Sequence, residues 1–194
     1  MENEAFEVAL EAAGALERLG VEFHLGGSLA SSIHGVPRAT LDADFVAALQ
    51  TGQGRRLCDE LGKGFYADPL AIESAIVRKG SFNVIHLSTM FKVDVFVAGE
   101  SPFSRTSFAR SVPQPIGPAG SCLRVATPED TVLHKLLWYR KGDQVSSRQW
   151  MDLVGVLEVQ QEGLDLEYLR RWASELELLV LLEKAMTEAR QGRG

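Results

Sequence analysis

The sequence predicts an α+β (α/β) fold, in which helices flank a mixed β-sheet and a helical region follows towards the C-terminus. Short apolar runs typical of strands alternate with helical patterns over residues 1–125, and helical patterns alone follow over residues 126–194. The chain has 194 residues, 45% of them apolar and 24% charged, which suits a globular protein with one substantial core. We therefore expect a core of residues 1–125 and a C-terminal helical subdomain of residues 126–194.

The core residues carry helix and strand patterns in mixed order. The predicted helices cover residues 4–19, 28–34, 53–61 and 69–78, and the predicted strands cover residues 21–25, 41–48, 82–87, 91–97 and 121–126. A three-residue connection between strands 82–87 and 91–97 predicts a hairpin. Residues 99–120 are rich in Ser, Pro and Gly and show no clear period, so we expect a surface loop, which could include a short strand or a turn of helix.

Helix-start signals dominate the last third of the chain. Thr127-Pro128-Glu129-Asp130 combines a capping hydroxyl, a proline at the first helical position and acids in the first turn. A second helix begins at Ser146 or Ser147, either of which can cap it. The predicted helices cover residues 128–140, 147–159, 165–174 and 176–190.

Composition excludes several classes of protein. No apolar stretch approaches the length of a membrane span, and the start Met-Glu-Asn-Glu does not resemble a signal peptide, so we expect a cytoplasmic protein without a membrane partner. Cys58 and Cys122 show no metal-ligand spacing and are expected to be reduced thiols. The net charge of −6 argues against an extended nucleic-acid surface, although it leaves room for a local basic patch.

Two acids on an otherwise apolar strand point to chemistry. Asp42 and Asp44 are two residues apart, so they project from the same face of the strand. Two like charges on a core strand are costly unless a positive charge lies between them, and a divalent metal is the simplest candidate. Asp94 lies mid-strand in a second apolar run and would complete a three-carboxylate cluster if the two strands are neighbours. Such a cluster suits Mg²⁺ (or Mn²⁺). The alternative is that Asp42 caps the strand and Asp44 pairs with Arg38.

A glycine turn precedes the acids. In Gly26-Gly27-Ser28 the glycines let the backbone approach a phosphate, and the amides of the helix that follows favour its negative charge. Taken alone, such a turn is more often structural than phosphate-binding.

Together these pieces resemble the nucleotidyltransferases of the DNA polymerase β superfamily. The resemblance rests on Leu25-Gly26-Gly27-Ser28, thirteen intervening residues, Asp42-Ala43-Asp44 and then Val93-Asp94-Val95. It implies a minimal nucleotidyltransferase core with a mixed, helix-flanked sheet. The Gly-Gly-Ser-Leu-Ala start, with the residues between it and the Asp pair, is similar to the AbiEii-like branch, small bacterial enzymes often found as toxins of toxin–antitoxin pairs.

The AbiEii-like resemblance also implies roles for further residues. Gly27 and Ser28 would bind the nucleotide, Lys135 would contact its phosphates, and Asp152 would help hold Lys135 or the site. Arg38 has two open roles, as a phosphate or substrate contact and as a counter-ion for the acids.

The expected activity is transfer of a nucleoside monophosphate from an NTP to an acceptor hydroxyl with release of pyrophosphate. Asp42 and Asp44 would bind metal, and Asp94 would act as a metal ligand or as a general base. The acceptor is RNA such as tRNA, a protein or a small molecule, and a cognate antitoxin is a further expected partner. The alternatives are a nucleotide-binding regulatory or antitoxin-like protein without turnover, and a structural protein whose C-terminal helices bind a partner.

Overall fold

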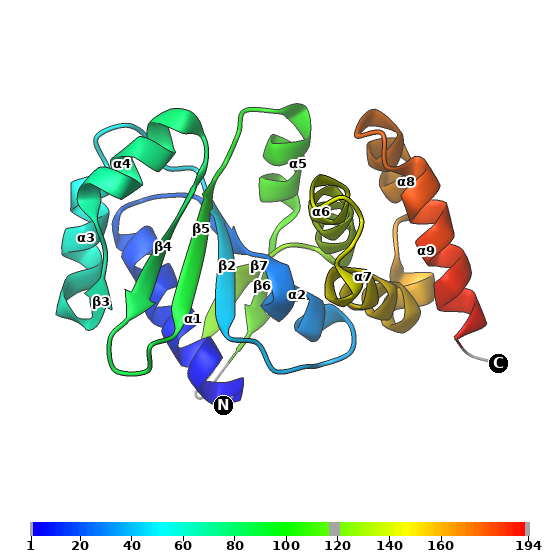
Figure 1. Ribbon diagram of the computed structural model, residues 1–194, viewed down its shortest axis with the longest axis horizontal. Coiled ribbons are helices and arrows are strands. Elements are labelled where there is room, and N and C mark those ends of the chain that lie inside the picture. The colour runs from blue at the N-terminus through cyan, green and yellow to red at the C-terminus, as the bar shows by residue number, and fades with distance from the viewer. Residues whose placement is uncertain (1, 117–120, 193–194) are drawn as a thin grey trace. The chain divides into compact units, whose positions relative to one another are not determined.

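The computed structural model describes residues 2–116 and 121–192. Its contacts divide the chain into two compact units (Figure 1). The sheet unit comprises Met1–Leu25 and Ala39–Val125, and the helical unit comprises Gly26–Arg38 and Ala126–Gly194. Within the described ranges, no helix combines the length and the apolar character that crossing a bilayer requires. The division at residue 125 expected from the sequence stays a prediction, and the structure groups the segment after the first strand with the C-terminal helices.

The sheet unit is built on a seven-stranded mixed sheet, as the sequence predicts. The strands are β1 (Phe23–Leu25), β2 (Asp42–Ala47), β3 (Phe65–Tyr66), β4 (Ser81–His86), β5 (Lys92–Val97), β6 (Val112–Pro115) and β7 (Cys122–Val125). Their order across the sheet is β3-β4-β5-β2-β1-β7-β6. The pairs β2·β5 and β1·β7 are parallel, and the other neighbours are antiparallel. The antiparallel pairing of β4 with β5 confirms the predicted hairpin.

Among residues 2–25, 39–116 and 121–125, the sheet unit has four α-helices. They are α1 (Glu2–Arg18), α3 (Gly54–Leu61), α4 (Pro69–Arg78) and α5 (Pro102–Arg110), and a short 3-10 turn, η1 (Gly62–Gly64), follows α3. Helix α1 packs on β2, α4 packs on β4, and α3 lies against both helices (Figure 1). Asp68 caps α4 by accepting hydrogen bonds from the amides of Leu70 and Ala71, and Pro69 occupies the first helical position. The caps therefore fix where these helices begin.

Residues 99–120 are more regular than the loop expected from the sequence. The strand β6 matches the short strand that the prediction allowed, but α5 has nine residues and is a full helix instead of a single turn. Helix α5 has a clear start, because Ser101 accepts a hydrogen bond from the Ser104 amide and Pro102 is the first helical residue. Its buried residues are only Phe103 and Ser107, so the helical period is too weak to detect. Residues 117–120, also assigned to this loop, lie outside the described residues, and the two-residue strand β3 was not predicted.

The helical unit contains the remaining helices. They are α2 (Gly27–His34), α6 (Pro128–Lys141), α7 (Ser147–Gln160), α8 (Leu166–Glu175) and α9 (Leu179–Gln191), with a 3-10 turn, η3 (Gln161–Gly163), between α7 and α8. The predicted starts of α6 and α7 are confirmed, with Thr127 and Ser146 as their caps. Helix α2 packs against α6 and α7. Gly35 allows this contact, because a Cβ there would lie 2.7 Å from the Val156 amide nitrogen.

Candidate functional site

The three predicted carboxylates lie on one face of two neighbouring strands. In the parallel pairing of β2 with β5, Asp42 is the register partner of Lys92, and Asp44 is the register partner of Asp94. The intervening residues Ala43 and Phe45 face the core and are fully buried, while the acids are half-buried. Register partners of a parallel pair share a face, at a strand spacing of about 4.8 Å. The sheet therefore brings together acids that are far apart in the sequence, as expected from the strand patterns.

A lysine shares the face of these acids. Lys92 Nζ lies 2.6 Å from Asp94 Oδ2, and the exposed fractions of the two side chains are 44% and 20%. The pKa of Lys92 is raised, first by its hydrogen bond to Asp94 and also by the charges of Asp94, Asp42 and Asp44, against the opposing effect of burial. The sequence led us to expect a metal as the neutralising charge, and in the structure a lysine ammonium lies beside Asp94.

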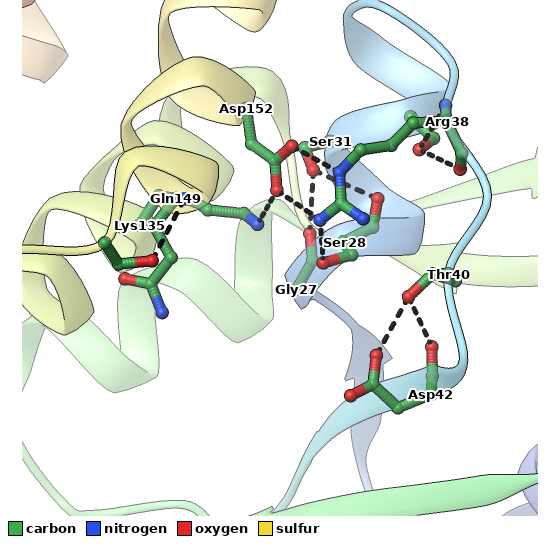
Figure 2. Close-up of polar contacts among 11 residues, drawn as sticks. Gly27, Ser28, Ser31, Arg38, Thr40, Asp42, Lys135, Gln149 and Asp152 are labelled. Atoms are coloured by element: carbon green, nitrogen blue, oxygen red, sulfur yellow. Dashed lines mark hydrogen bonds and ion pairs between the residues drawn. The ribbon is translucent and has the colours of Figure 1, made fainter.

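The acids fit a hard divalent cation by donor type, since Mg²⁺ takes carboxylate oxygens. As arranged in the structure, however, they do not form a complete metal site. Across residues 2–116 and 121–192, no group of three or more His, Cys, Asp or Glu side chains is placed to hold one metal ion. The Asp94 carboxylate is engaged by Lys92, and Asp42 Oδ1 accepts a hydrogen bond of 2.9 Å from Thr40 Oγ1 (Figure 2). These are the contacts with which a bound ion would compete.

The glycine turn forms the start of α2 in the helical unit. Gly27 has a φ of +57°, a left-handed conformation that glycine adopts without strain. Gly26 is the N-cap and provides no side chain to cap the first amides of the helix. The Ser31 hydroxyl donates to the carbonyls of Gly27 and Ser28 and so stiffens this turn. A helix start of this kind suits an anion, although the feature alone does not define a site.

A connected set of charged residues extends from this turn through the helical unit. Figure 2 shows Asp152 of α7 between Arg38 and Lys135. Arg38 binds Asp152 in a bidentate pair, with Nε 2.6 Å from Oδ1 and Nη2 2.8 Å from Oδ2. Arg38 Nη2 also donates to Ser28 Oγ at 2.7 Å, and Lys135 Nζ lies 2.5 Å from Asp152 Oδ2. The predicted residues Ser28, Arg38, Lys135 and Asp152 therefore form one chain of contacts.

Burial makes the Asp152 contacts strong. The exposed fractions of the Lys135 and Asp152 side chains are 7% and 6%. Burial alone would raise the pKa of Asp152, but hydrogen bonds from Arg38 and Lys135, with their charges, lower it overall. Two cations facing one carboxylate leave a net positive charge in this chain of contacts. This positive charge is suited to attract an anionic group such as a phosphate.

His24 and His34 take structural places. The His24 ring is buried in β1, 4.9 Å from the Phe108 ring. His34 Nε2 donates to the Ala126 carbonyl at 2.7 Å, and Gln160 donates to the His34 carbonyl. Burial lowers the pKa of His34. His34 therefore joins α2 to the residues before α6 as a neutral ring.

Sequence reasoning missed Lys92 and gave no site role to Thr40. A usable signal existed for Lys92, because a residue two before Asp94 on the same strand shares its face. For Thr40 the signal was weaker, since its hydroxyl reaches Asp42 from the chain preceding β2.

Comparisons with known proteins support the fold. No protein-family model and no curated protein matches the chain. The antibiotic-resistance factor ANT(2'')-Ia in solution matches with 13% identity and a TM-score of 0.54, over 97% of this chain and 100% of that one. A crystal structure of ANT(2'')-Ia in complex with adenylyl-2''-tobramycin matches with 14% identity and a TM-score of 0.51, over 89% of this chain and 98% of that one. The chain thus has a nucleotidyltransferase-like fold.

Proposed function

We propose that this protein is a metal-dependent nucleotidyltransferase that moves a nucleoside monophosphate from an NTP to an acceptor hydroxyl. The observation that carries the proposal is the register of β2 and β5, which places Asp42, Asp44 and Asp94 on one face of a nucleotidyltransferase-like sheet. Acidic side chains on neighbouring strands of a sheet are costly without a functional reason.

Asp42 and Asp44 would hold Mg²⁺ or Mn²⁺, and Asp94 would join them once it is freed from Lys92. A bound ion of this kind neutralises phosphate charge and favours the alkoxide form of the attacking hydroxyl. Asp94 has two candidate roles, as a ligand or as the general base that accepts the proton of the acceptor hydroxyl at a carboxylate oxygen. Either role requires that Lys92 release the Asp94 carboxylate.

The helical unit would bind the phosphates of the NTP. The amides of Gly27 and Ser28 would donate to phosphate oxygens, as helix starts do. The Ser28 hydroxyl accepts a bond from Arg38, which leaves its own proton for a phosphate oxygen. Lys135 and Arg38 would supply positive charge, and Asp152 would orient both of them.

Three classes of acceptor are candidates for this protein. The complex of ANT(2'')-Ia with adenylyl-2''-tobramycin makes a small-molecule acceptor one candidate for this chain. RNA such as tRNA and a protein hydroxyl are the others. The Gly-Gly-Ser-Leu-Ala motif supports an AbiEii-like enzyme, and hence a cytoplasmic toxin with a cognate antitoxin.

A non-catalytic nucleotide-binding protein is the second candidate. It is favoured by the engagement of Asp94 with Lys92 and by the incomplete metal arrangement among the described residues. This regulatory or antitoxin-like protein would bind an NTP without transferring any part of it.

Two measurements on the purified protein distinguish these candidates. Thermal unfolding with Mg²⁺ and each NTP tests binding, because a ligand at a hundred times its Kd adds about 2.7 kcal/mol of stability. Incubation with α-labelled NTPs and cell lysate tests transfer and identifies the acceptor. The proposal expects both a stability increase and a labelled acceptor. Stabilisation without label in RNA, protein or small molecules would establish the non-catalytic alternative. If the protein is not stabilised and no acceptor is labelled, both candidate functions are refuted.

A further inference from the structure

Lys92 lies among the acids in a defined position. It is the register partner of Asp42 and precedes Asp94 by two residues, so its stem rises from the same face of the sheet as all three carboxylates. Its ammonium reaches Asp94 Oδ2 at 2.6 Å. The Lys92 ammonium therefore shares a face with three carboxylates, and these four side chains together carry a net negative charge that attracts a cation.

The side chain of Lys92 is able to move away from Asp94. It is 44% exposed, whereas the Asp94 side chain is 20% exposed. A lysine presents a compact charge on a flexible four-carbon stem, so it can move into solvent without disturbing the strand. An ion pair exposed to this degree is weak, which makes it replaceable by a divalent ion.

We infer that Lys92 is a built-in counter-ion of the acid cluster, which holds Asp94 until a divalent cation displaces the ammonium. This inference rests on the proposed function, because it assigns the cluster to a metal. Lys92 is then a positioning residue, since it acts through Asp94. It stabilises the metal-free sheet and sets a threshold for metal binding.

The raised pKa of Lys92 agrees with its place among the three acids. It is raised chiefly by the hydrogen bond to Asp94, and the charges of Asp42 and Asp44 add to the effect. The ammonium therefore interacts with every acid of the cluster and not with Asp94 alone.

The test compares Mn²⁺ affinity and metal-free stability in three proteins after treatment with EDTA. The variant Lys92→Met removes the charge and keeps the length of the side chain. The matched control Lys79→Met removes an exposed charge beside Gly80, whose carbonyl accepts from Val97 at the other end of β5. Calorimetry should show Lys92→Met binding Mn²⁺ about tenfold more tightly than the wild type, because a like charge beside the ion is gone. Lys79→Met should remain within about twofold of the wild type, because its charge lies far from the cluster.

Metal-free stability provides the second result. Lys92→Met should melt at a lower temperature than the wild type in EDTA, and Mg²⁺ should raise its melting temperature more. Equal Mn²⁺ affinity in Lys92→Met and the wild type would overturn the inference, as would an absence of Mn²⁺ uptake by both. The proposed function is judged separately, by label transfer in the wild type with Mg²⁺, so the two failures are distinguishable.

Discussion

Arg38 and Asp152 form a bidentate ion pair, with contacts of 2.6 and 2.8 Å, that ties the segment after α2 to helix α7. The same carboxylate receives Lys135, and the same guanidinium reaches Ser28. Residues that are far apart in the sequence thus share one electrostatic arrangement at the start of α2. The position of a phosphate-binding group would depend on Asp152, although Asp152 itself carries the wrong charge to bind a phosphate.

The first prediction concerns Asp152→Asn. The substitution keeps the shape but removes the charge between two cations, so the buried Lys135 would lose its ion pair with Asp152. Breaking such a pair typically costs about 3–5 kcal/mol, and the partial exposure of Arg38 reduces the expected loss to roughly 2–3 kcal/mol. Urea unfolding measures it. Glu167→Gln, an exposed acid on α8, is the matched control and should change stability by less than about 0.5 kcal/mol. Equal stability of both variants would contradict the role given to Asp152.

The second prediction concerns Gly27→Ala. A side chain at a φ of +57° costs about 1–2 kcal/mol of stability, and the Cβ narrows the approach to the helix start. We expect this stability loss together with weaker NTP binding, read from the ligand-induced rise in melting temperature. Gly64→Ala is the control, because Gly64 has no positive φ and a Cβ there meets nothing within 4 Å. If Gly27→Ala binds NTP as well as the wild type does, the turn is structural.

The third prediction concerns pH. The pKa of His34 is lowered by burial, and that of His134 is lowered by burial to about 4. In the unfolded chain both would take up protons below about pH 6.5, while in the folded protein they take up these protons only at a lower pH. The unfolded state then binds more protons, so stability falls as the pH falls from about 6.5 to about 4, by up to roughly 3 kcal/mol from His134. Urea unfolding at pH 7 and pH 4.5 measures the loss, and His134→Gln should show a smaller one. If the stability is independent of pH over this range, the predicted contribution of the buried histidines is contradicted.

Much of the fold could be predicted from local patterns. The strands that carry Asp42, Asp44 and Asp94 follow from apolar runs, and the register of β2 with β5 confirms that these strands are neighbours. Helix α5 could not be predicted from its period, because only Phe103 and Ser107 are buried. The available evidence was its start, where the hydroxyl cap Ser101 precedes Pro102, as Thr127 precedes Pro128 at the start of α6.

The candidate site was predicted less completely than the fold. The pairing of Lys135 with Asp152 was implied by resemblance and is present in the structure. The partner of Arg38 could not be derived, because Asp152 follows it by more than a hundred residues and local patterns do not report such contacts. Lys92 was missed because the search for a positive charge ended at a metal, although the strand alternation placed a lysine on the same face.

The central claim is nucleotidyl transfer by an enzyme that depends on the acid face, and Asp44→Asn tests it most directly. The measurement is the rate of label transfer from α-labelled NTP to the identified acceptor, with Mg²⁺, for the wild type and the variant at equal concentration. Circular dichroism and the melting temperature of Asp44→Asn establish that it is folded. We expect a folded variant whose rate is at least about a hundredfold lower, since loss of a proposed metal ligand would remove charge stabilisation in the transition state. A folded Asp44→Asn that transfers label at the wild-type rate would contradict the central claim.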